Sequence, residues 1–341
     1  CKACMVDCPS GVDVSKMILE IRARLAQKHG LNKTAKVLAA NRYMSMLASA
    51  FAPVSNAFMK NKAVRKIMQT LTGIDQRISL PKFSFSSFVK KANKYLASQP
   101  KLESPADKVA YFTDIFVNYN DHELGFAVIK FLRANNIDVI IPRQRPAPLP
   151  AAVYGDIRTS RKDLRYNVMH LSKVVKSGYK IICSEPSAAL CLKEDLRFFD
   201  EGKDAKLVSE NTFEFFEYLK SMNLPAACAC RLETNYAHHT PCHLTAISQK
   251  PAVLEVMEKL TGIKVKELNG GCCGIAGTFG MQAKNYDLSV QIGSKLAEKI
   301  KESNADVVLT ECSTCKIQIE HLTGKETIHP IKILAKAYGL I

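Results

Sequence analysis

Five cysteines near the C-terminal end of the sequence fall into three tight groups. These groups are Cys242-His243, Gly271-Cys272-Cys273-Gly274 and Cys312-Ser313-Thr314-Cys315. Each group follows a short apolar run, and such runs alternate with amphipathic helical patterns, which predicts an α/β sheet. Loops that leave the carboxyl ends of neighbouring parallel strands converge on one crevice. We therefore expect the thiols of all three groups to meet at one site.

Grouped thiols of this kind indicate a metal site. The chain has 12 Cys in 341 residues, which is too sparse for a small secreted disulfide scaffold. Thiolates suit iron–sulfur clusters or zinc, and glycines beside Cys272 and Cys273 let the backbone turn tightly. His239 and His243 flank Cys242 and offer imidazole groups that bind metals or move protons near neutral pH. Iron–sulfur, zinc and a metal-free cysteine core remain open.

The sequence begins inside a second metal motif. Cys1, Cys4 and Cys8-Pro9 match the last three cysteines and the proline of the ferredoxin run C-x2-C-x2-C-x3-C-P. The fourth cysteine of such a run serves the other cluster in two-cluster ferredoxins. We therefore expect Cys1, Cys4 and Cys8 to bind [4Fe-4S] clusters whose remaining ligands lie upstream, and we expect the chain to be a fragment.

The α/β pattern occurs twice. We expect strands at residues 109–112, 139–141 and 181–182, and again at 236–240, 263–268 and 307–309. An offset of about 125–129 residues pairs Gly155 with Gly280 and Cys183 with Cys312, as an internal duplication would. Because only Cys183 keeps its register, we expect the first copy to bind no cluster and instead to wall the crevice or form a partner surface.

The expected fold class is therefore α/β, with four segments. These are a truncated ferredoxin-type motif and helix at 1–30, a basic helical segment at 31–104, a degenerate cysteine-rich half at 105–224 and a Cys-Cys-Gly half at 225–341. Cys191 is expected in the core of the first half. Cys228 and Cys230, in the connection between the halves, are expected to be bystanders.

Positive charge is concentrated in the helical segment. Residues 1–101 hold 18 basic and 4 acidic side chains, whereas the whole chain has a net charge of +16. This surplus, which includes Lys60, Lys62, Arg65 and Lys66, is either a solvated face or a docking surface for an acidic partner, an anionic substrate or lipid headgroups. Nucleic acid is disfavoured because no recognition motif is present and the aromatics at 83, 85 and 88 alternate like core residues.

The apolar stretch at residues 43–59 is too polar for a transmembrane helix. Its serines and Pro53 predict a packed or interfacial helix pair broken at the proline. We find no P-loop, dinucleotide fingerprint, nucleophile elbow or zinc-protease helix. No catalytic residue is assigned, and the cysteines equip the chain for electron transfer.

The three-part cysteine set resembles the Cys-Cys-Gly domain of heterodisulfide reductase subunits, anaerobic glycerol-3-phosphate dehydrogenase electron-transfer subunits and FAD-linked 2-hydroxy-acid dehydrogenases. The segment order is similar to the C-terminal part of bacterial FAD-linked oxidoreductases of the D-lactate and D-2-hydroxyglutarate type. This similarity rests on the ferredoxin run and on further motifs. They are Val12-Asp13, Leu71-Thr72-Gly73-Ile74-Asp75-Gln76-Arg77, Leu80-Pro81, Glu185-Pro186-Ser187 and Ala276-Gly277-Thr278-Phe279-Gly280.

The resemblance implies the iron–sulfur portion of an oxidoreductase. FAD would sit on an upstream domain or subunit that oxidises a small 2-hydroxy acid such as D-lactate, D-2-hydroxyglutarate or glycolate, and electrons would pass to a quinone or a redox protein. The implied location is cytoplasmic, with peripheral contact to the inner face of the membrane. The alternatives are a separate iron–sulfur subunit of anaerobic glycerol-3-phosphate dehydrogenase or of a heterodisulfide-reductase-like complex, and a non-catalytic zinc-binding module.

Overall fold

The N-terminal segment of the chain is helical, as the sequence predicts. The computed structural model describes residues 2–6, 8–226, 234–248 and 250–341. The first helices are α1 (Ala3–Val6), α2 (Val14–His29), α3 (Lys33–Ala39), α4 (Asn41–Ala50), α5 (Ala52–Lys60), α6 (Lys62–Thr72) and α7 (Phe88–Ser98).

Local capping signals set the ends of these helices. The side chain of Asn61 accepts hydrogen bonds from backbone N–H groups at the start of α6. Gly73 ends this helix with a φ of 75°, in the left-handed region. The break between α4 and α5 falls at Phe51 rather than at Pro53, because proline is tolerated in the first turn of a helix. The helix pair predicted at 43–59 is therefore present, with its break two residues earlier.

The first α/β half contains a four-stranded parallel sheet in the order β2-β1-β3-β4. Its strands are β1 (Asp107–Phe112), β2 (Ile137–Ile140), β3 (Lys180–Cys183) and β4 (Thr212–Glu214). Its helices are α8 (Ile115–Tyr119), α9 (His122–Ala134), α10 (Leu149–Val153), α11 (Ile157–Lys176), α12 (Pro186–Leu190), the π-helix η1 (Cys191–Asp195), α13 (Leu196–Phe199), α14 (Lys203–Glu210) and α15 (Phe215–Lys220).

The second half repeats this design with a parallel sheet in the order β6-β5-β7-β8. Its strands are β5 (Tyr236–His238), β6 (Lys266–Glu267), β7 (Val307–Leu309) and β8 (Thr327–Ile328). Its helices are α16 (Cys242–Ile247), α17 (Val253–Thr261), the 3-10 helix η2 (Ala283–Asn285), α18 (Tyr286–Ser303), α19 (Ser313–Thr323) and α20 (Pro330–Ala337). The α/β fold class is confirmed, and the two sheets share one strand order.

The predicted correspondence between Cys183 of the first half and Cys312 of the second half is wrong. Cys183 is the last residue of β3 and pairs with Phe112, whereas Leu309 ends β7 and pairs with His238. Cys312 comes later and is the N-cap of α19, a position that Glu185 occupies before α12 in the first half. Cys183 therefore corresponds to a strand residue, and Glu185 stands where the second half places Cys312.

Two short edge strands were not predicted from the sequence. Strand β4 has three residues and β8 has two, so neither provides the alternation on which strand prediction depends. The strand expected at 263–268 shrinks to the two residues of β6. The other expected strands are present within a few residues of their predicted bounds.

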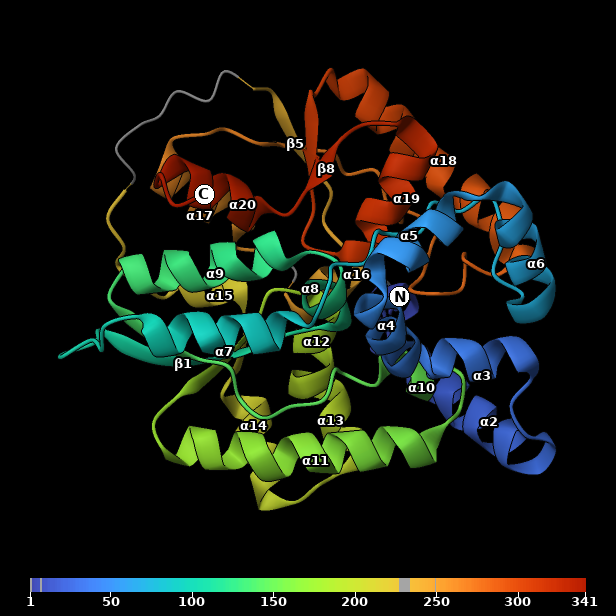
Figure 1. Ribbon diagram of the computed structural model, residues 1–341, viewed down its shortest axis with the longest axis horizontal. Coiled ribbons are helices and arrows are strands. Elements are labelled where there is room, and N and C mark those ends of the chain that lie inside the picture. Colours follow the sequence, from blue (N-terminus) through green and yellow to red (C-terminus); the bar gives the residue numbers. More distant parts are fainter. Residues whose placement is uncertain (1, 7, 227–233, 249) are drawn as a thin grey trace.

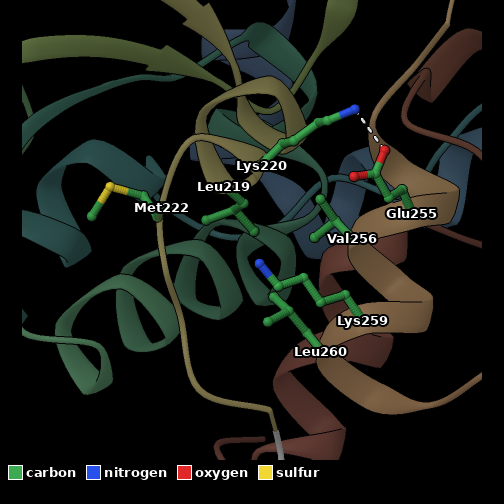
Figure 2. Close-up of a pocket in the computed structure, with 7 residues that line it drawn as sticks. All are labelled: Leu219, Lys220, Met222, Glu255, Val256, Lys259 and Leu260. Carbon is green, nitrogen blue, oxygen red and sulfur yellow. Dashed lines mark hydrogen bonds and ion pairs between the residues drawn. The ribbon is translucent and has the colours of Figure 1, made fainter.

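The two halves share a hydrophobic core. One cluster of buried residues joins Phe131 and Phe216 of the first half to Met257 and Leu334 of the second, and α9 packs against α20 in the same region. Helices α15 and α17 also meet, around a small pocket whose rim carries an ion pair between Lys220 and Glu255 (Figure 2). The halves therefore pack as one unit.

The N-terminal helices lie beside both halves (Figure 1). Helices α2 and α3 contact α10 of the first half, and Ile74 forms an isolated bridge with Gln282 of the second. Phe88 is fully buried, but Phe85 is 64% exposed. The expectation that these aromatics all belong to the core is therefore wrong for Phe85.

Candidate metal centre

Three loops of the second half carry the predicted thiols to one edge of its sheet. Strand β5 leads into α16, whose first residue is Cys242. The loop after β6 carries Cys272 and Cys273. After β7, Cys312 caps α19 and Cys315 lies in the first turn of this helix. These are the carboxyl ends of parallel strands, where ligands bind in open α/β sheets.

The thiols form one continuous cluster. The Sγ atoms of Cys273 and Cys315 are 3.4 Å apart, and the backbone N–H of Cys315 donates to Cys312 Sγ over 3.5 Å. The thiol of Cys272 lies in hydrogen-bond contact with those of Cys242 and Cys273. Cysteines from three distant stretches of the sequence are thereby brought together, and their role as ligands remains a prediction.

His239 adds an imidazole to this cluster. Its ring and the thiols of Cys273 and Cys315 place one ligand atom each within 4.8 Å of one another. The side chain is 2% exposed, and its Nε2 atom has no hydrogen-bond partner among the described residues. Burial lowers the pKa of His239 to about 4, so the ring is neutral, which is the form that binds metals.

Two of the five sulfurs are stabilised as thiolates. Hydrogen bonds from Cys242 and Cys273 lower the pKa of Cys272 to about 2, and the contact with Cys315 lowers the pKa of Cys312 to about 6. The pKa of Cys315 is raised well above its usual value, first by its hydrogen bond to Cys273. A cation at the cluster would favour deprotonation of all the thiols that bind it.

Glycines allow the Cys-Cys loop to lie against helix α18. Gly274 has a φ of 90°, and an added Cβ would lie 2.0 Å from the backbone oxygen of Ser289. A Cβ on Gly293 of α18 would in turn lie 2.5 Å from the oxygen of Cys273. Both positions therefore require glycine because two backbones approach each other closely.

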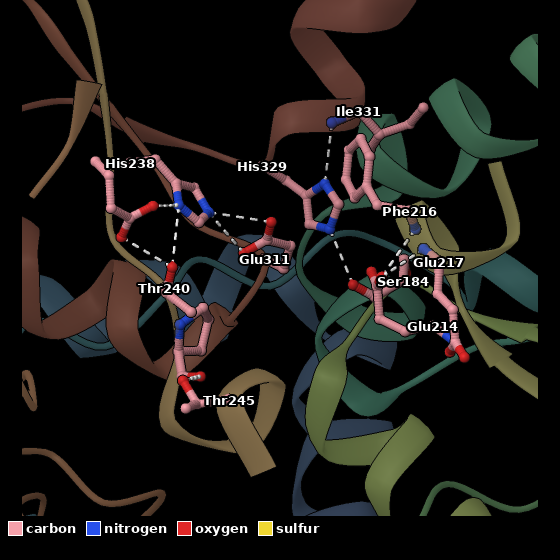
Figure 3. Close-up of polar contacts among 12 residues, drawn as sticks. Ser184, Glu214, Phe216, Glu217, His238, Thr240, Thr245, Glu311, His329 and Ile331 are labelled. Atoms are coloured by element: carbon pink, nitrogen blue, oxygen red, sulfur yellow. Dashed lines mark hydrogen bonds and ion pairs between the residues drawn. The ribbon is translucent and has the colours of Figure 1, made fainter. Parts of the chain in front are cut away.

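A Glu-His-Glu cluster around the fully buried His238 lies at or just after the ends of the same three strands (Figure 3). His238 Nδ1 lies 3.0 Å from Glu267 Oε2, and His238 Nε2 lies 3.1 Å from both carboxylate oxygens of Glu311. Burial alone would lower the pKa of His238, but the two carboxylates, with Glu311 foremost, raise it to about 10. The imidazolium therefore links the ends of β5 and β6 to the residue that precedes Cys312.

This Glu-His-Glu cluster was not predicted from the sequence. The sequence pattern indicates His239 and His243 as the imidazoles beside Cys242, and it does not single out His238, Glu267 or Glu311. The available signal was the position of each residue at or just after the end of a strand that precedes a cysteine group. Sequence alone does not show that such residues point toward one another.

The first half contributes side chains to the wall of this site. Glu185 Oε2 accepts a hydrogen bond from the backbone N–H of Ser313 over 2.9 Å. Ser187 Oγ lies 2.8 Å from His243 Nδ1. Burial lowers the pKa of His243 to about 3, so its ring is neutral. These contacts support the expectation that the half without the cysteine set walls the crevice.

The ferredoxin-type run lies next to the cysteine-rich site. Helix α1 contains Cys4 and packs against α16, the helix that begins with Cys242. Cys4 is exposed, and Cys8 is partly exposed. Cys1, the remaining predicted ligand of this run, lies outside the described residues.

The other cysteines have different surroundings. Cys183 and Cys191 are buried in the hydrophobic core of the first half, and burial raises the pKa of each well above the usual value. The prediction that Cys191 is a core residue is confirmed. Cys228 and Cys230, predicted to be bystanders, lie outside the described residues.

The donor set fits a thiolate-ligated metal centre. Sulfur and imidazole donors suit iron–sulfur clusters and zinc, and the buried Nε2 of His239 makes no hydrogen bond within the described part of the chain. Cys242, Cys272, Cys273, Cys312 and Cys315 would hold such a group, with His239 beside them. The group would supply single-electron transfer if it is an iron–sulfur cluster.

Comparison with known proteins agrees with this geometry. Residues 236–320 match a family described as a cysteine-rich domain. The C subunit of the anaerobic glycerol-3-phosphate dehydrogenase of Escherichia coli is 31% identical to this chain over 335 residues, which cover 96% of this chain and 83% of that protein. The chain belongs to the family of this C subunit.

Other relatives include oxidoreductases and iron–sulfur proteins. D-2-hydroxyglutarate dehydrogenase of Escherichia coli is 23% identical over 354 residues, covering 98% of this chain and 33% of the dehydrogenase. An uncharacterized iron–sulfur protein of Methanococcus maripaludis is 26% identical over 267 residues, covering 76% of this chain and 49% of that protein. Similarity to these proteins supports an iron–sulfur component of an oxidoreductase.

Proposed function

We propose that this protein is the separate iron–sulfur subunit of a dehydrogenase complex of the anaerobic glycerol-3-phosphate type. It would carry electrons from a flavin-bearing partner to an acceptor. The observation that carries this proposal is the 31% identity to the C subunit of that dehydrogenase over nearly the whole chain. Similarity to D-2-hydroxyglutarate dehydrogenase is lower, at 23%. The sequence motifs favour the FAD-linked 2-hydroxy-acid dehydrogenase and leave the separate iron–sulfur subunit as an alternative. The difference in identity favours this alternative.

The arrangement of the two cysteine sites supports transfer within the chain. Cys4 lies on α1, which packs against the helix that begins with Cys242. A [4Fe-4S] centre bound by Cys4 would therefore adjoin the cysteine-rich centre. A reduced flavin holds two electrons, whereas iron–sulfur clusters accept one at a time. Two adjacent centres would each accept one of the two flavin electrons.

We further propose that consecutive helices α4, α5 and α6 contact a membrane surface, where a quinone acceptor would be available. Eight large apolar side chains on or between these helices are between 53 and 60% exposed: Tyr43, Met46, Leu47, Phe51, Val54, Phe58, Ile67 and Leu71. Lys60, Lys62 and Lys66 are exposed among them. Exposed apolar side chains combined with basic residues are typical of helices that lie in the interface of an anionic membrane.

Arg65 does not belong to this surface, although the sequence groups it with the neighbouring lysines. Its side chain is buried, and its Nη2 atom donates to the backbone oxygens of Asp75 and Ile78 over 2.8 Å each.

Within the described residues, the chain has no helix that combines the length and the apolar character needed to span a bilayer. The proposed contact is therefore peripheral.

Anaerobic purification followed by iron, acid-labile sulfide and zinc analysis tests the electron-transfer proposal. Several irons per chain with matching sulfide, and a loss of iron in a Cys273→Ala variant, are expected. Reduction of the purified chain by a flavin-bearing partner with glycerol 3-phosphate, and not with a 2-hydroxy acid, would identify the dehydrogenase type. One zinc per chain without sulfide would contradict the proposal and would support the zinc-binding module.

A further inference from the structure

The β3–α12 junction of the first half, residues 184–187, lies against the metal-binding half. Ser184 and Glu185 are 1% and 8% exposed. His329 Nε2 lies 2.9 Å from the backbone oxygen of Ser184, as Figure 3 shows. Glu185 and Ser187 reach toward the helices that carry the cysteines. This junction occupies the place in the first half that the loop with Cys312 occupies in the second.

A single hydrogen-bond chain runs through this junction. Ser187 Oγ donates to Glu185 Oε1 over 3.2 Å, so its only hydrogen is engaged. Ser187 Oγ also lies 2.8 Å from His243 Nδ1, and the imidazole donates this hydrogen bond in the tautomer that carries its proton on Nδ1. Glu185 Oε2 accepts from Ser313 N.

The two ends of this chain are next to predicted ligands. His243 follows Cys242 at the start of α16, and Ser313 follows Cys312 at the start of α19. Two of the three elements that carry thiols are thus tied to one carboxylate of the other half. Helix α12, which begins directly after Glu185, also packs against α16.

We propose that Glu185 and Ser187 are positioning residues for the metal centre, and that this is why a half without the cysteine set accompanies the half that carries it. They fix the distance between the α16 and α19 termini and the orientation of the His243 ring. The proposal rests on the proposed metal centre, since positioning matters only if the thiols bind a group. Partners of this kind orient metal ligands and tune the metal in other proteins.

The test uses the full chain, purified anaerobically as wild type and as Glu185→Ala, Glu185→Gln, Ser187→Ala and Ser184→Ala. Glutamine keeps an acceptor oxygen for the N–H of Ser313. Among the described residues, the hydroxyl of Ser184 hydrogen-bonds to Tyr111 of its own half, so Ser184→Ala is the matched control from the same junction. The readouts are the rate of iron loss to a chelator, the EPR spectrum and the midpoint potential, with Cys273→Ala used to assign the signal.

We expect Glu185→Ala to lose iron from the cysteine-rich centre about 10-fold or more faster than wild type and to shift its EPR signal and potential. Glu185→Gln is expected to restore the chelator resistance, and Ser184→Ala is expected to match wild type. Ser187→Ala, which leaves Glu185 in place, is expected to shift the EPR signal by freeing His243. This variant keeps the test open if Glu185→Ala does not fold.

The two proposals fail in different ways. Wild-type protein without iron at the cysteine-rich site would remove the proposed function and this inference together. Iron in the wild type, with unchanged spectra and chelator resistance in Glu185→Ala and Ser187→Ala, would overturn the positioning role alone. An equal effect of Ser184→Ala would assign the change to general packing and would also overturn it.

Discussion

At the scale of single residues, the metal site depends on backbone approach and on buried charge. The Cys-Cys loop reaches α18 only because Gly274 and Gly293 lack side chains. Below the site, His238 holds two carboxylates, and Glu214 lies buried close enough to Glu311 for their charges to interact. The sequence shows the glycines beside the cysteines, but it does not show which glutamates become buried.

Gly274→Ala should disrupt the site through sterics alone. The added Cβ would lie 2.0 Å from Ser289 O on the backbone of α18, and the φ of 90° is unfavourable for alanine. We expect a loss of about 2 kcal/mol or more in the free energy of unfolding, together with loss of bound iron. Urea denaturation and iron analysis measure both effects.

A matched control is Gly271→Ala. Gly271 also has a positive φ, but an added Cβ would meet no atom within 4 Å. We expect this variant to show backbone strain of about 1 kcal/mol and to retain iron. Equal stability and iron content for Gly274→Ala and wild type would contradict the close approach of the loop to α18.

Glu214 should make stability depend on pH. Burial, followed by the nearby Glu311, raises the pKa of Glu214 to about 8 from its ordinary value of 4.5. Between these two values the folded protein keeps a proton that the unfolded chain releases, so the stability contribution of this group falls as pH rises through the window. Glu214→Gln removes this dependence and keeps an acceptor for the N–H groups of Phe216 and Glu217.

We expect the free energy of unfolding of Glu214→Gln to rise relative to that of wild type as pH increases from about 5 to about 7.5. This range lies between the unfolded and folded pKa values of Glu214. The relative gain should approach about 1.4 kcal/mol per pH unit as an upper limit. Urea denaturation of both proteins at several pH values measures it. Parallel pH profiles for the two proteins would show that Glu214 ionises normally in the folded state.

At the scale of elements, the sequence located helices well but did not show which faces they bury. The helix expected within residues 1–30 is α2, and it carries an apolar stripe of Met17, Ile18, Ile21 and Leu25, yet these side chains are between 42 and 58% exposed. Helical periodicity identifies an amphipathic helix, and whether its apolar face meets protein or membrane depends on neighbouring elements.

The proposed membrane contact can be tested on α5 and α6. Neutralising Lys60, Lys62 and Lys66 to Gln removes three charges that would each contribute about 1 kcal/mol near an anionic surface. We expect binding to vesicles that contain phosphatidylserine to weaken by about 100-fold. Vesicle co-sedimentation measures it, and binding to neutral vesicles should be weak for both proteins.

A charge-matched control comes from another part of the chain. Arg165, Lys173 and Lys203 are also exposed, but they belong to α11 and α14 of the first half. Neutralising these three residues is expected to leave vesicle binding unchanged. Equal losses in both triple variants would mean that net charge alone drives binding and would refute a specific face.

At the scale of the whole molecule, one buried ion pair attaches the ferredoxin-type run to the first half. Lys2 Nζ lies 2.7 Å from Asp195 Oδ1, and both side chains are at least nine-tenths buried. Asp195 ends the π-helix η1. Through this contact, Lys2, which directly precedes α1, is held where α1 packs against α16.

Removing one partner of this pair should destabilise the protein more than removing both. Asp195→Leu leaves the buried Lys2 ammonium with the longer contact of 3.8 Å to Asp13 Oδ2, and breaking a buried ion pair typically costs about 3–5 kcal/mol. The double variant with Lys2→Met is expected to recover much of this loss. Urea denaturation of both single variants and the double variant completes the cycle. Additive losses would show that the two groups do not interact.

The sequence by itself determined the α/β class, the duplication and the identity of the cysteine groups, because these follow from periodicity and residue type along the chain. Only the tertiary structure decided that Cys273 meets Cys315, that Glu185 stands at the position of Cys312, and that His238 joins two glutamates. Such contacts join residues far apart in sequence, and they depend on how loops leave the strands and how two halves face each other. The local pattern of residue types along the chain predicts neither the path of these loops nor the packing of the two halves.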